Sequence, residues 1–175
     1  TIASHLPRAV GVAFALGRAK RLGLDSAWPH DAVTVCSFGD ASLNHSTAVG
    51  ALNTAGYCVA QGLPLALLFV CEDNGLGISV PSPHGWVAEA AHRPGIGYVT
   101  ASGDDPDGLT ATLAETVEAV RRTRRPALLH LRTVRYLGHA GTDVESGYRA
   151  PSALAADRER DPLLALAARI GGSEP

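Results

Sequence analysis

The first residues that could do chemistry lie where a short apolar run ends. Residues 33–38 (VTVCSF) are typical of a buried strand, and the segment GDASLN, residues 39–44, follows them directly. Gly-Asp is a common turn pair, so Asp40 could be an ordinary solvated turn residue. Asp40 becomes a candidate ligand only if the fold places a second oxygen donor beside it.

That second donor is Asn74, which follows the next apolar run, residues 65–71. In a parallel sheet the carboxyl ends of all strands share one edge, where ligands bind, so both residues would face this edge. Mg²⁺ prefers oxygen ligands, often one or two carboxylates together with substrate phosphates. A helix beginning after residue 44 would also direct free N–H groups toward an anion. The two residues therefore predict a site for a metal-bound diphosphate.

The elements that must position these residues follow from the apolar pattern. Strands are expected at residues 33–38, 65–71, 98–102 and 127–134, and helices at 6–22, 45–61, 108–124 and 153–170. Asp161-Pro162 should start a new helical segment within the last of these. Segments 75–97 and 136–150 are expected to be loops. Strands that alternate with helices predict an α/β fold, a three-layer αβα arrangement around a mostly parallel sheet.

The length and net charge of the chain argue against some classes of function. The 175 residues suffice for a single domain, residues 1–175, with a sizeable core. A net charge of −2 gives no general attraction to nucleic acid or to an anionic membrane. No apolar run reaches the roughly 18 residues that a membrane helix needs. We therefore expect neither nucleic acid nor membrane as a partner.

The cysteines indicate a cellular location, and the absence of methionine indicates that the chain is part of a longer protein. Cys36, Cys58 and Cys71 lie in apolar segments, without the spacing of zinc ligands or of a redox pair. Buried free thiols suit a reducing compartment, so a cytoplasmic location is expected. There is no methionine and no signal-peptide pattern, and Thr1 leads almost at once into a helical pattern. We expect a fragment of a longer protein.

Longer segments resemble a known family. Residues 39–56 and 63–79 (GDASLNHSTAVGALNTAG and LPLALLFVCEDNGLGIS) resemble the thiamine diphosphate motif, which opens with Gly-Asp and closes with Asn-Asn or a variant. Residues 4–15 (SHLPRAVGVAFA) resemble the helix that precedes it, and residues 131–149 (LRTVRYLGHAGTDVESGYR) resemble a long active-site loop. Over nearly its whole length the chain thus resembles the alpha subunit of the decarboxylating component of 2-oxoacid dehydrogenases. The likeness is to the branched-chain and pyruvate types, or to the alpha-type half of a fused chain.

The resemblance implies a set of cofactor-binding residues. Mg²⁺ would be held by oxygens of three residues: Asp40, Asn74 and, through its backbone carbonyl, Leu76. Backbone groups would face the diphosphate at Gly39, Ala41 and Ser42. In and beside the active-site loop, residues 136–150, Arg135 would contact phosphate. His139 would lie near the thiazolium ring as the catalytic residue that handles substrate or acyl group.

The resemblance also implies an activity and its partners. The reaction would be oxidative decarboxylation of a 2-oxo acid, with acyl transfer to a lipoyl group on an acyltransferase component. In this family a glutamate of the beta-type subunit or domain activates the cofactor, so this chain would be active only with that partner. A hetero-tetramer, or a homodimer of fused chains, is the implied assembly.

The sequence departs from the family pattern in three places. Asp40 and Asn74 are 34 residues apart, a few more than is typical, and the excess fits in the connection at 61–64 and in the strand. Asp73 stands where the family has the first Asn of its pair. Ala140 follows the loop histidine, where animal enzymes carry a regulatory serine, so phosphorylation at this position is impossible.

Several alternatives stay open at this point. Another thiamine diphosphate enzyme, such as an acetoin dehydrogenase or a transketolase, would share the motif, although the loop at 135–149 disfavours transketolase. A non-catalytic fragment that only docks to a partner is the alternative from another class. A nicotinamide-binding reading of residues 75–80 fails because Pro81 and Pro83 forbid the helix that must follow.

Two further features are expected to be structural. His130 lies in an apolar strand and should be a core histidine with its hydrogen bonds satisfied. The arginines at 121, 122, 124 and 125 should form a solvated helix end.

Overall fold

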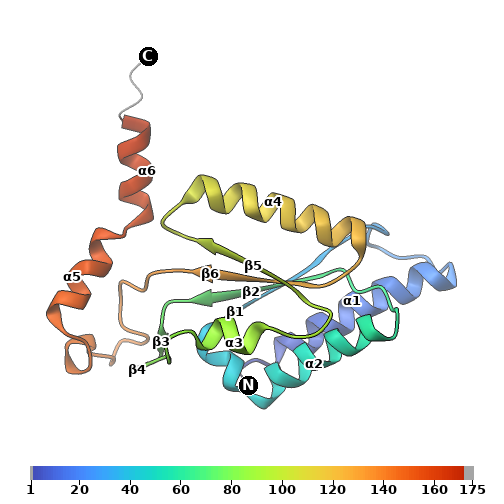
Figure 1. The fold of residues 1–175 in the computed structure, drawn as a ribbon, viewed down its shortest axis with the longest axis horizontal. Helices are drawn as coiled ribbons and strands as arrows, with labels where there is room; N and C mark the ends of the chain where they lie inside the picture. The colour runs from blue at the N-terminus through green and yellow to red at the C-terminus, as the bar shows by residue number, and fades with distance from the viewer. Residues whose placement is uncertain (1, 172–175) are drawn as a thin grey trace.

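Four parallel strands form the central sheet of the computed structural model, which describes residues 2–171 (Figure 1). Their order across the sheet is β1 (Thr34–Gly39), β2 (Leu67–Asp73), β6 (Ala127–Arg132) and β5 (Gly97–Ser102). Gly39 pairs with Glu72, and Asp73 pairs with Arg132. The carboxyl ends of β1, β2 and β6 therefore lie together, as the predicted parallel sheet requires.

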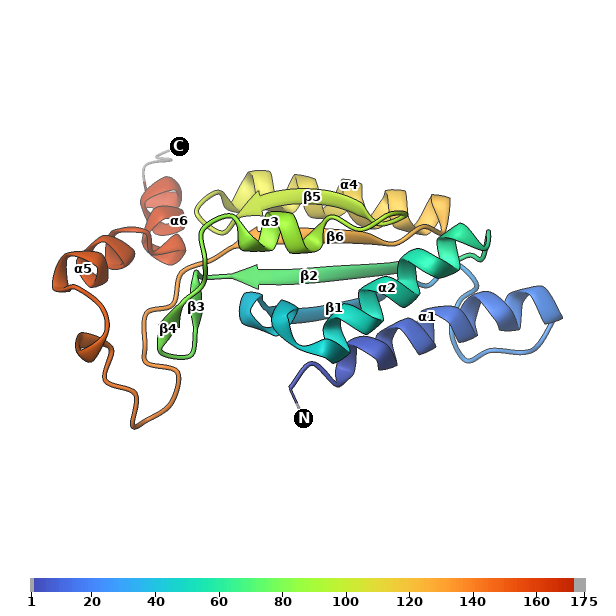
Figure 2. The same cartoon turned by 60° about the horizontal axis from the view of Figure 1, so that its bottom comes forward.

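Helices cover both faces of this sheet and make the predicted three layers (Figures 1 and 2). On one face α1 (His5–Leu22), α2 (Ser46–Ala60) and the short α3 (Trp86–Ala91) enclose the larger core with Phe69 and Leu67 of β2. On the other face α4 (Pro106–Thr123) packs over Leu68 and Leu129. Because α4 covers β5, β6 and β2, the edge strand β1 is left half-covered.

The burial pattern of β1 reflects this one-sided cover. Cys36 and Phe38 point into the larger core, whereas Val35 is 58 % exposed on the opposite face. His5 of α1 contacts the backbone carbonyl oxygen of Ser37 at 2.8 Å and so occupies one acceptor of this edge strand. The continuous apolar run of residues 33–38 thus marks a strand that is buried on one face only.

The loop segments contain more regular structure than the sequence predicts. In 75–97 a two-stranded antiparallel pair, β3 (Leu76–Gly77) and β4 (Val80–Pro81), precedes α3. Ile78 in its turn has φ of 59°. Two 3₁₀ helices, η1 (Asp40–Asn44) and η2 (Glu145–Gly147), were not predicted either. Their shortness explains the omission, because one or two turns leave no apolar period to detect.

The last two helices lie beyond the carboxyl ends of the strands (Figure 1). The helix predicted at 153–170 is two helices, α5 (Pro151–Glu159) and α6 (Pro162–Gly171), with the break at Asp161-Pro162 as expected. Neither buries a residue. Arg160 ties this region to Asp104 through hydrogen bonds of 3.0 and 2.8 Å. Within residues 2–171, every helix is too short or too polar to traverse a bilayer.

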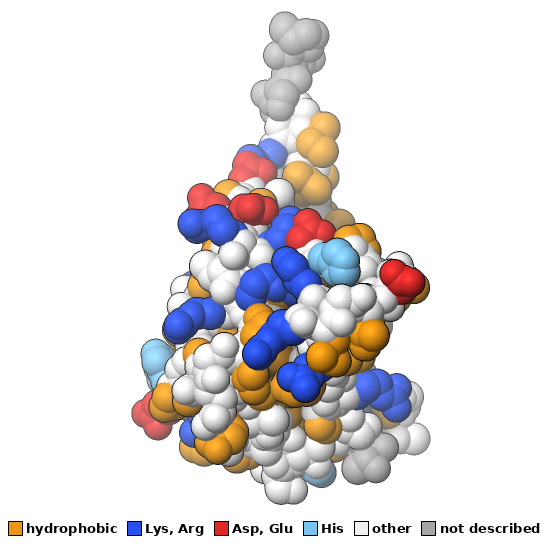
Figure 3. Space-filling model, turned by 90° about the vertical axis from the view of Figure 1, so that its right-hand side faces the viewer, with side chains coloured by type: hydrophobic (Ala, Val, Ile, Leu, Met, Phe, Trp, Pro, Cys, Tyr) orange, Lys and Arg blue, Asp and Glu red, His pale blue; other side chains and the backbone are white. Residues whose placement is uncertain are grey.

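Lysine and arginine side chains gather at the opposite end of the molecule, where α1 and α4 finish (Figure 3). The prediction of a solvated helix end is wrong for Arg124. Its Nη1 donates to the carbonyl oxygen of Ala32 at 3.1 Å, and burial lowers the pKa of its guanidinium. Arg121 also has a partner, Glu118, at 3.2 Å. This end is remote from the edge that holds Asp40 and Asn74.

Candidate functional site

The structure brings the predicted metal ligands to one edge of the sheet. Asp40 follows β1 and Asn74 follows β2, and these two strands are hydrogen-bonded neighbours. The segments that carry them also touch, since a Cβ added at Gly77 would lie 3.1 Å from the Cβ of Ala41. The two parts of the motif, separate in sequence, therefore form one continuous surface at the carboxyl edge.

Asp40 is the buried acid of this edge. It is 2 % exposed at the start of η1, and its Oδ2 accepts a hydrogen bond from the Ser82 hydroxyl. Burial raises the pKa of the Asp40 carboxyl, against the Ser82 hydrogen bond that lowers it, and the nearby Asp73 carboxylate raises it further. A carboxylate in such a place is stabilised by a cation.

Asn74 and Leu76 occupy the turn between β2 and β3. The side-chain oxygen of Asn74 accepts from the backbone N–H of Leu76 at 3.0 Å. Gly75 between them has φ of 72°, a left-handed conformation that favours glycine. Both predicted ligands thus lie in one short turn, and the left-handed backbone of Gly75 gives this turn its shape.

Asp73 makes more contacts than the sequence suggests. Its Oδ1 accepts from the N–H of Gly75 at 2.9 Å, and its Oδ2 lies 2.7 Å from Nε2 of His130. Nδ1 of His130 in turn lies 2.7 Å from the hydroxyl of Tyr98. His130 is therefore a strand histidine with both ring nitrogens hydrogen-bonded, as predicted, but it is only partly buried and lies outside the core. Sequence reasoning missed Asp73 and Tyr98 because only the strand order brings them to His130.

The residues expected to face a diphosphate lie at the end of β1 and in η1. Gly39 is extended, with φ −77° and ψ 155°, and Ala41 and Ser42 belong to the 3₁₀ turn that follows. Helix α2 begins after this turn at Ser46, and the ring of His45 accepts from the N–H of Thr47 at 3.1 Å. The expected helix thus follows the Gly-Asp pair with one 3₁₀ turn between them.

Arg135 points at the turn between β3 and β4 and at its own loop. One Nη donates to the carbonyl oxygen of Ile78 at 2.6 Å, and the other to the Tyr148 hydroxyl at 2.6 Å and to Glu145 at 3.2 Å. Its Nε is buried without a hydrogen-bond acceptor. Arg135 therefore links the predicted active-site loop to the segment that carries Leu76, and it keeps one donor unused.

His139 is exposed, and Asp143 holds its backbone. The N–H of His139 donates to Oδ2 of Asp143 at 2.7 Å, and the same carboxylate accepts from Tyr148 at 2.8 Å and from Ser79 at 3.1 Å. The hydrogen bond from His139 lowers the pKa of the Asp143 carboxyl. Asp143 thus anchors the loop at 136–150. The sequence alone does not predict this role, because it depends on contacts with residues elsewhere in the fold.

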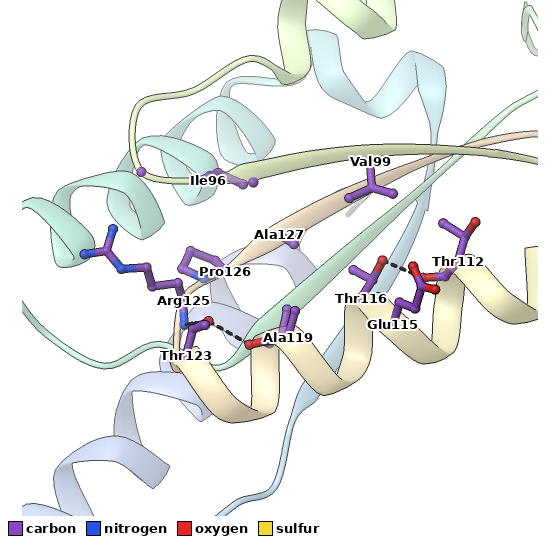
Figure 4. Close-up of a pocket in the computed structure, with 13 residues that line it drawn as sticks. Ile96, Val99, Thr112, Glu115, Thr116, Ala119, Thr123, Arg125, Pro126 and Ala127 are labelled. Atoms are coloured by element: carbon purple, nitrogen blue, oxygen red, sulfur yellow. Dashed lines mark hydrogen bonds between the residues drawn. The ribbon is translucent and has the colours of Figure 1, made fainter.

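Two cavities differ in their relation to these residues. One of about 490 Å³ opens at the carboxyl edge beside Asp73, Asn74, Ser82 and His130. A larger one, of about 570 Å³, lies between α4 and β5, with Val99 and Thr116 in its wall (Figure 4). The larger cavity contains none of the predicted site residues. Ligands of α/β sheets bind at the carboxyl edge, so the smaller cavity belongs to the candidate site.

The donor set at this edge is made of oxygens from different groups. Within residues 2–171 there is no group of three or more His, Cys, Asp or Glu side chains that could hold a metal. The predicted set has one carboxylate, one amide oxygen and one backbone carbonyl. Such a set leaves positions around Mg²⁺ for water and phosphate, which is how this ion is usually bound.

Comparisons with known proteins identify the family of the chain. The sequence model of a family described as "Dehydrogenase E1 component" matches residues 1–173. The chain is 29% identical over 173 residues to the 2-oxoisovalerate dehydrogenase subunit alpha of Bacillus subtilis, covering 97% of this chain and 48% of that protein. It is 30% identical over 154 residues to the mitochondrial subunit of that name from Homo sapiens, covering 85% of this chain and 31% of that protein. The chain thus spans about half or less of the length of these relatives.

A solved structure shares the fold. The transketolase from Leishmania mexicana superposes with a TM-score of 0.52 at 20% sequence identity, over 75% of this chain and 19% of that one. At this identity the likeness concerns the parallel sheet and its helices alone.

Proposed function

The chain belongs to the dehydrogenase E1 component family, and from this premise we propose that it binds thiamine diphosphate and Mg²⁺ as the alpha-type part of a 2-oxoacid dehydrogenase. The names of the relatives from Bacillus subtilis and Homo sapiens favour a branched-chain 2-oxo acid as substrate. The proposed reaction is oxidative decarboxylation, with transfer of the acyl unit to a lipoyl group of an acyltransferase component.

The observation that carries this proposal is the buried carboxylate of Asp40 beside the turn of Asn74 and Leu76. Desolvation raises the pKa of Asp40, and no positively charged side chain forms an ion pair with it in the described part of the chain. A divalent cation at this place would compensate the buried charge. The residues present therefore fit the ion, with Asp40, Asn74 and the Leu76 carbonyl as its protein ligands.

The diphosphate fits the same edge. Backbone groups of Gly39, Ala41 and Ser42 would face it, and the unused Nε–H of Arg135 is a donor for which a phosphate oxygen is a suitable acceptor. When bound, thiamine diphosphate supplies the chemistry that separates the carboxyl group from the 2-oxo carbon. The protein's part is to bind and orient the cofactor and the substrate.

His139 is proposed to act on the substrate or the acyl group from the active-site loop. Its side chain is exposed and its backbone is held by Asp143, so the loop presents the imidazole outward. A second polypeptide that faces the loop would enclose it. We propose that a beta-type subunit or domain is this partner, in a hetero-tetramer or a homodimer of fused chains.

We also propose a cytoplasmic location. Cys36, Cys58 and Cys71 are free and buried, and burial raises the pKa of the Cys36 and Cys71 thiols. Thiols in this state suit a reducing compartment.

Calorimetric titration tests the proposed function. Thiamine diphosphate with Mg²⁺ is titrated into the full-length protein, with and without its beta-type partner, and into Asp40→Ala and Asp25→Ala variants. Asp25 is exposed in the connection after α1 and serves as the matched carboxylate. We expect binding that depends on the partner, is lost in Asp40→Ala and is unchanged in Asp25→Ala. Equal binding by Asp40→Ala, or no binding by the wild type with its partner, would reject the proposal.

A further inference from the structure

A chain of hydrogen bonds runs across three strands of the sheet to the turn that carries Asn74. It starts at the Tyr98 hydroxyl of β5, which lies 2.7 Å from Nδ1 of His130 in β6. Nε2 of His130 lies 2.7 Å from Oδ2 of Asp73, the last residue of β2. Oδ1 of the same carboxylate accepts from the N–H of Gly75 at 2.9 Å. His130 is thus the central link between the sheet and the turn.

The same chain continues to the other predicted ligand of the metal. The carbonyl oxygen of Gly75 accepts from the N–H of Ser82 at 2.8 Å, and the Ser82 hydroxyl donates to Oδ2 of Asp40. Asn74 and Leu76 lie on either side of Gly75 and are joined to each other by a 3.0 Å hydrogen bond. A shift of Gly75 would therefore move both the Asn74 oxygen and the support of Asp40.

The hydrogen bonds of His130 determine which ring nitrogen carries the proton in the neutral imidazole. The carboxylate of Asp73 can only accept, so Nε2 carries the proton and Nδ1 accepts from the Tyr98 hydroxyl. The side chain of His130 is 12 % exposed and that of Asp73 21 % exposed. The ring of His92 packs on Tyr98, with 4.6 Å between ring centres. Both nitrogens of the imidazole therefore have a partner, and the tyrosine also contacts a second aromatic ring.

We propose that His130 is a positioning residue for the cation: it fixes the Asp73 carboxylate, which fixes the turn that presents Asn74 and Leu76. This inference rests on the proposed function and extends it to a residue outside the proposed set of metal ligands. What the imidazole adds is a donor aimed at Asp73.

Partners of this kind affect metal affinity strongly. Residues that orient a metal ligand from behind typically change affinity by about 10–100-fold when they are replaced. We therefore expect His130→Leu to raise the half-saturating Mg²⁺ concentration, at saturating thiamine diphosphate, by about tenfold or more. His130→Gln keeps an N–H donor toward Asp73 and should restore most of the affinity. Tyr98→Phe removes only the outer hydroxyl and should give a smaller rise.

A neighbouring variant separates positioning from loss of packing. Leu129 follows Leu128 in β6 and packs against the α4 face, away from Asp73. Leu129→Val should lower the unfolding temperature while leaving the half-saturating Mg²⁺ concentration unchanged. The titrations are made on the full-length protein with its beta-type partner, followed by intrinsic fluorescence.

Hydrogen–deuterium exchange of the cofactor-free protein gives a second readout. Peptides that cover residues 73–82 should exchange faster in His130→Leu than in the wild type, and remain as in the wild type in Leu129→Val. Wild-type affinity together with wild-type exchange in a folded His130→Leu protein would overturn the inference. An equal loss of affinity in Leu129→Val would overturn it too. Failure of the wild type to bind thiamine diphosphate would instead reject the proposed function, and unchanged exchange in His130→Leu would then reject the inference as well.

Discussion

The Ser82 hydroxyl donates a hydrogen bond to Oδ2 of Asp40, across 42 positions of sequence. This contact fastens the segment after β4 to the start of η1, where the carboxylate is 2 % exposed. A hydroxyl is a weak substitute for a cation beside a buried carboxylate, because it supplies one donor and no charge. The folded protein is therefore expected to be less stable without a cation beside Asp40 than with one.

Replacing Asp40 by asparagine should separate stability from cofactor binding. An amide oxygen can still accept from Ser82, and the buried charge is gone. We expect the cofactor-free Asp40→Asn protein to unfold at a higher temperature than the wild type at pH 7, by about 2–4 °C if the gain is about 1 kcal/mol. Mg²⁺-dependent binding of thiamine diphosphate should be lost. Circular dichroism melts and calorimetry measure the two effects, and a lower melting temperature would contradict the argument.

His139 should matter for activity and not for folding. Its side chain is exposed and makes no hydrogen bond in the described structure; only its backbone N–H is engaged, with Asp143. We expect His139→Ala to reduce the decarboxylation rate by about 10²-fold or more, as for a lost acid–base group. The free energy of unfolding should change by no more than about 0.5 kcal/mol. Steady-state kinetics and denaturant titration of the assembled enzyme give both numbers.

A second histidine serves as the control for this prediction. His30 is exposed in the connection between α1 and β1, far along the chain from the loop. His30→Ala should leave rate and stability as in the wild type. If His139→Ala retains the wild-type rate, the role inferred from the family resemblance does not hold for this chain.

Asp143 should anchor the loop at 136–150 in a pH-dependent way. The hydrogen bond from His139 lowers the pKa of this carboxyl in the folded protein. Its contribution is therefore fully present above the ordinary aspartate pKa of about 3.9 and is lost as the pH falls below it, because the unfolded chain takes up the proton first. We expect the difference in melting temperature between wild type and Asp143→Asn to be constant from about pH 8 to 5 and to shrink below about pH 4.

Limited proteolysis tests at neutral pH whether Asp143 holds the loop in place. Without the carboxylate, Tyr148, Ser79 and the backbone of His139 lose a shared acceptor. Cleavage within residues 136–150 should become faster by about threefold or more in Asp143→Asn. Asp25→Asn, which changes an exposed carboxyl, should be cleaved at the wild-type rate.

The sequence predicts the layers of this fold well because each strand and helix carries its own apolar pattern. The edge at which Asp40 and Asn74 meet follows from a general property of parallel sheets, so it too could be inferred before the structure. The end of β2 could not, because Glu72 and Asp73 are polar and continue the strand only through pairing with β1 and β6. Pairing partners are a property of the sheet and leave no local signal.

The contacts around the candidate site could not be predicted from the sequence for the same reason. Tyr98, His130 and Asp73 lie on three strands whose spatial order differs from their order in sequence. Asp143 has the sequence context of an ordinary polar loop residue, and its role as a shared acceptor appears only where the loop closes on Ser79 and Tyr148. Motifs locate groups that bind a ligand directly, whereas groups that orient them depend on the folded neighbourhood.

Two glycines of α2 offer a matched test of its packing. A Cβ at Gly56 would lie 2.5 Å from the carbonyl oxygen of Pro94, whereas a Cβ at Gly50 would meet nothing within 4 Å. Gly56→Ala should therefore force the helix away from the 93–95 segment and destabilise the fold by about 1–3 kcal/mol. Gly50→Ala should stabilise it by about 0.5–1 kcal/mol, because alanine favours a helix interior over glycine. Denaturant titrations of the two variants measure both changes. Equal effects of the two substitutions would show that the close approach to Pro94 does not govern the position of α2.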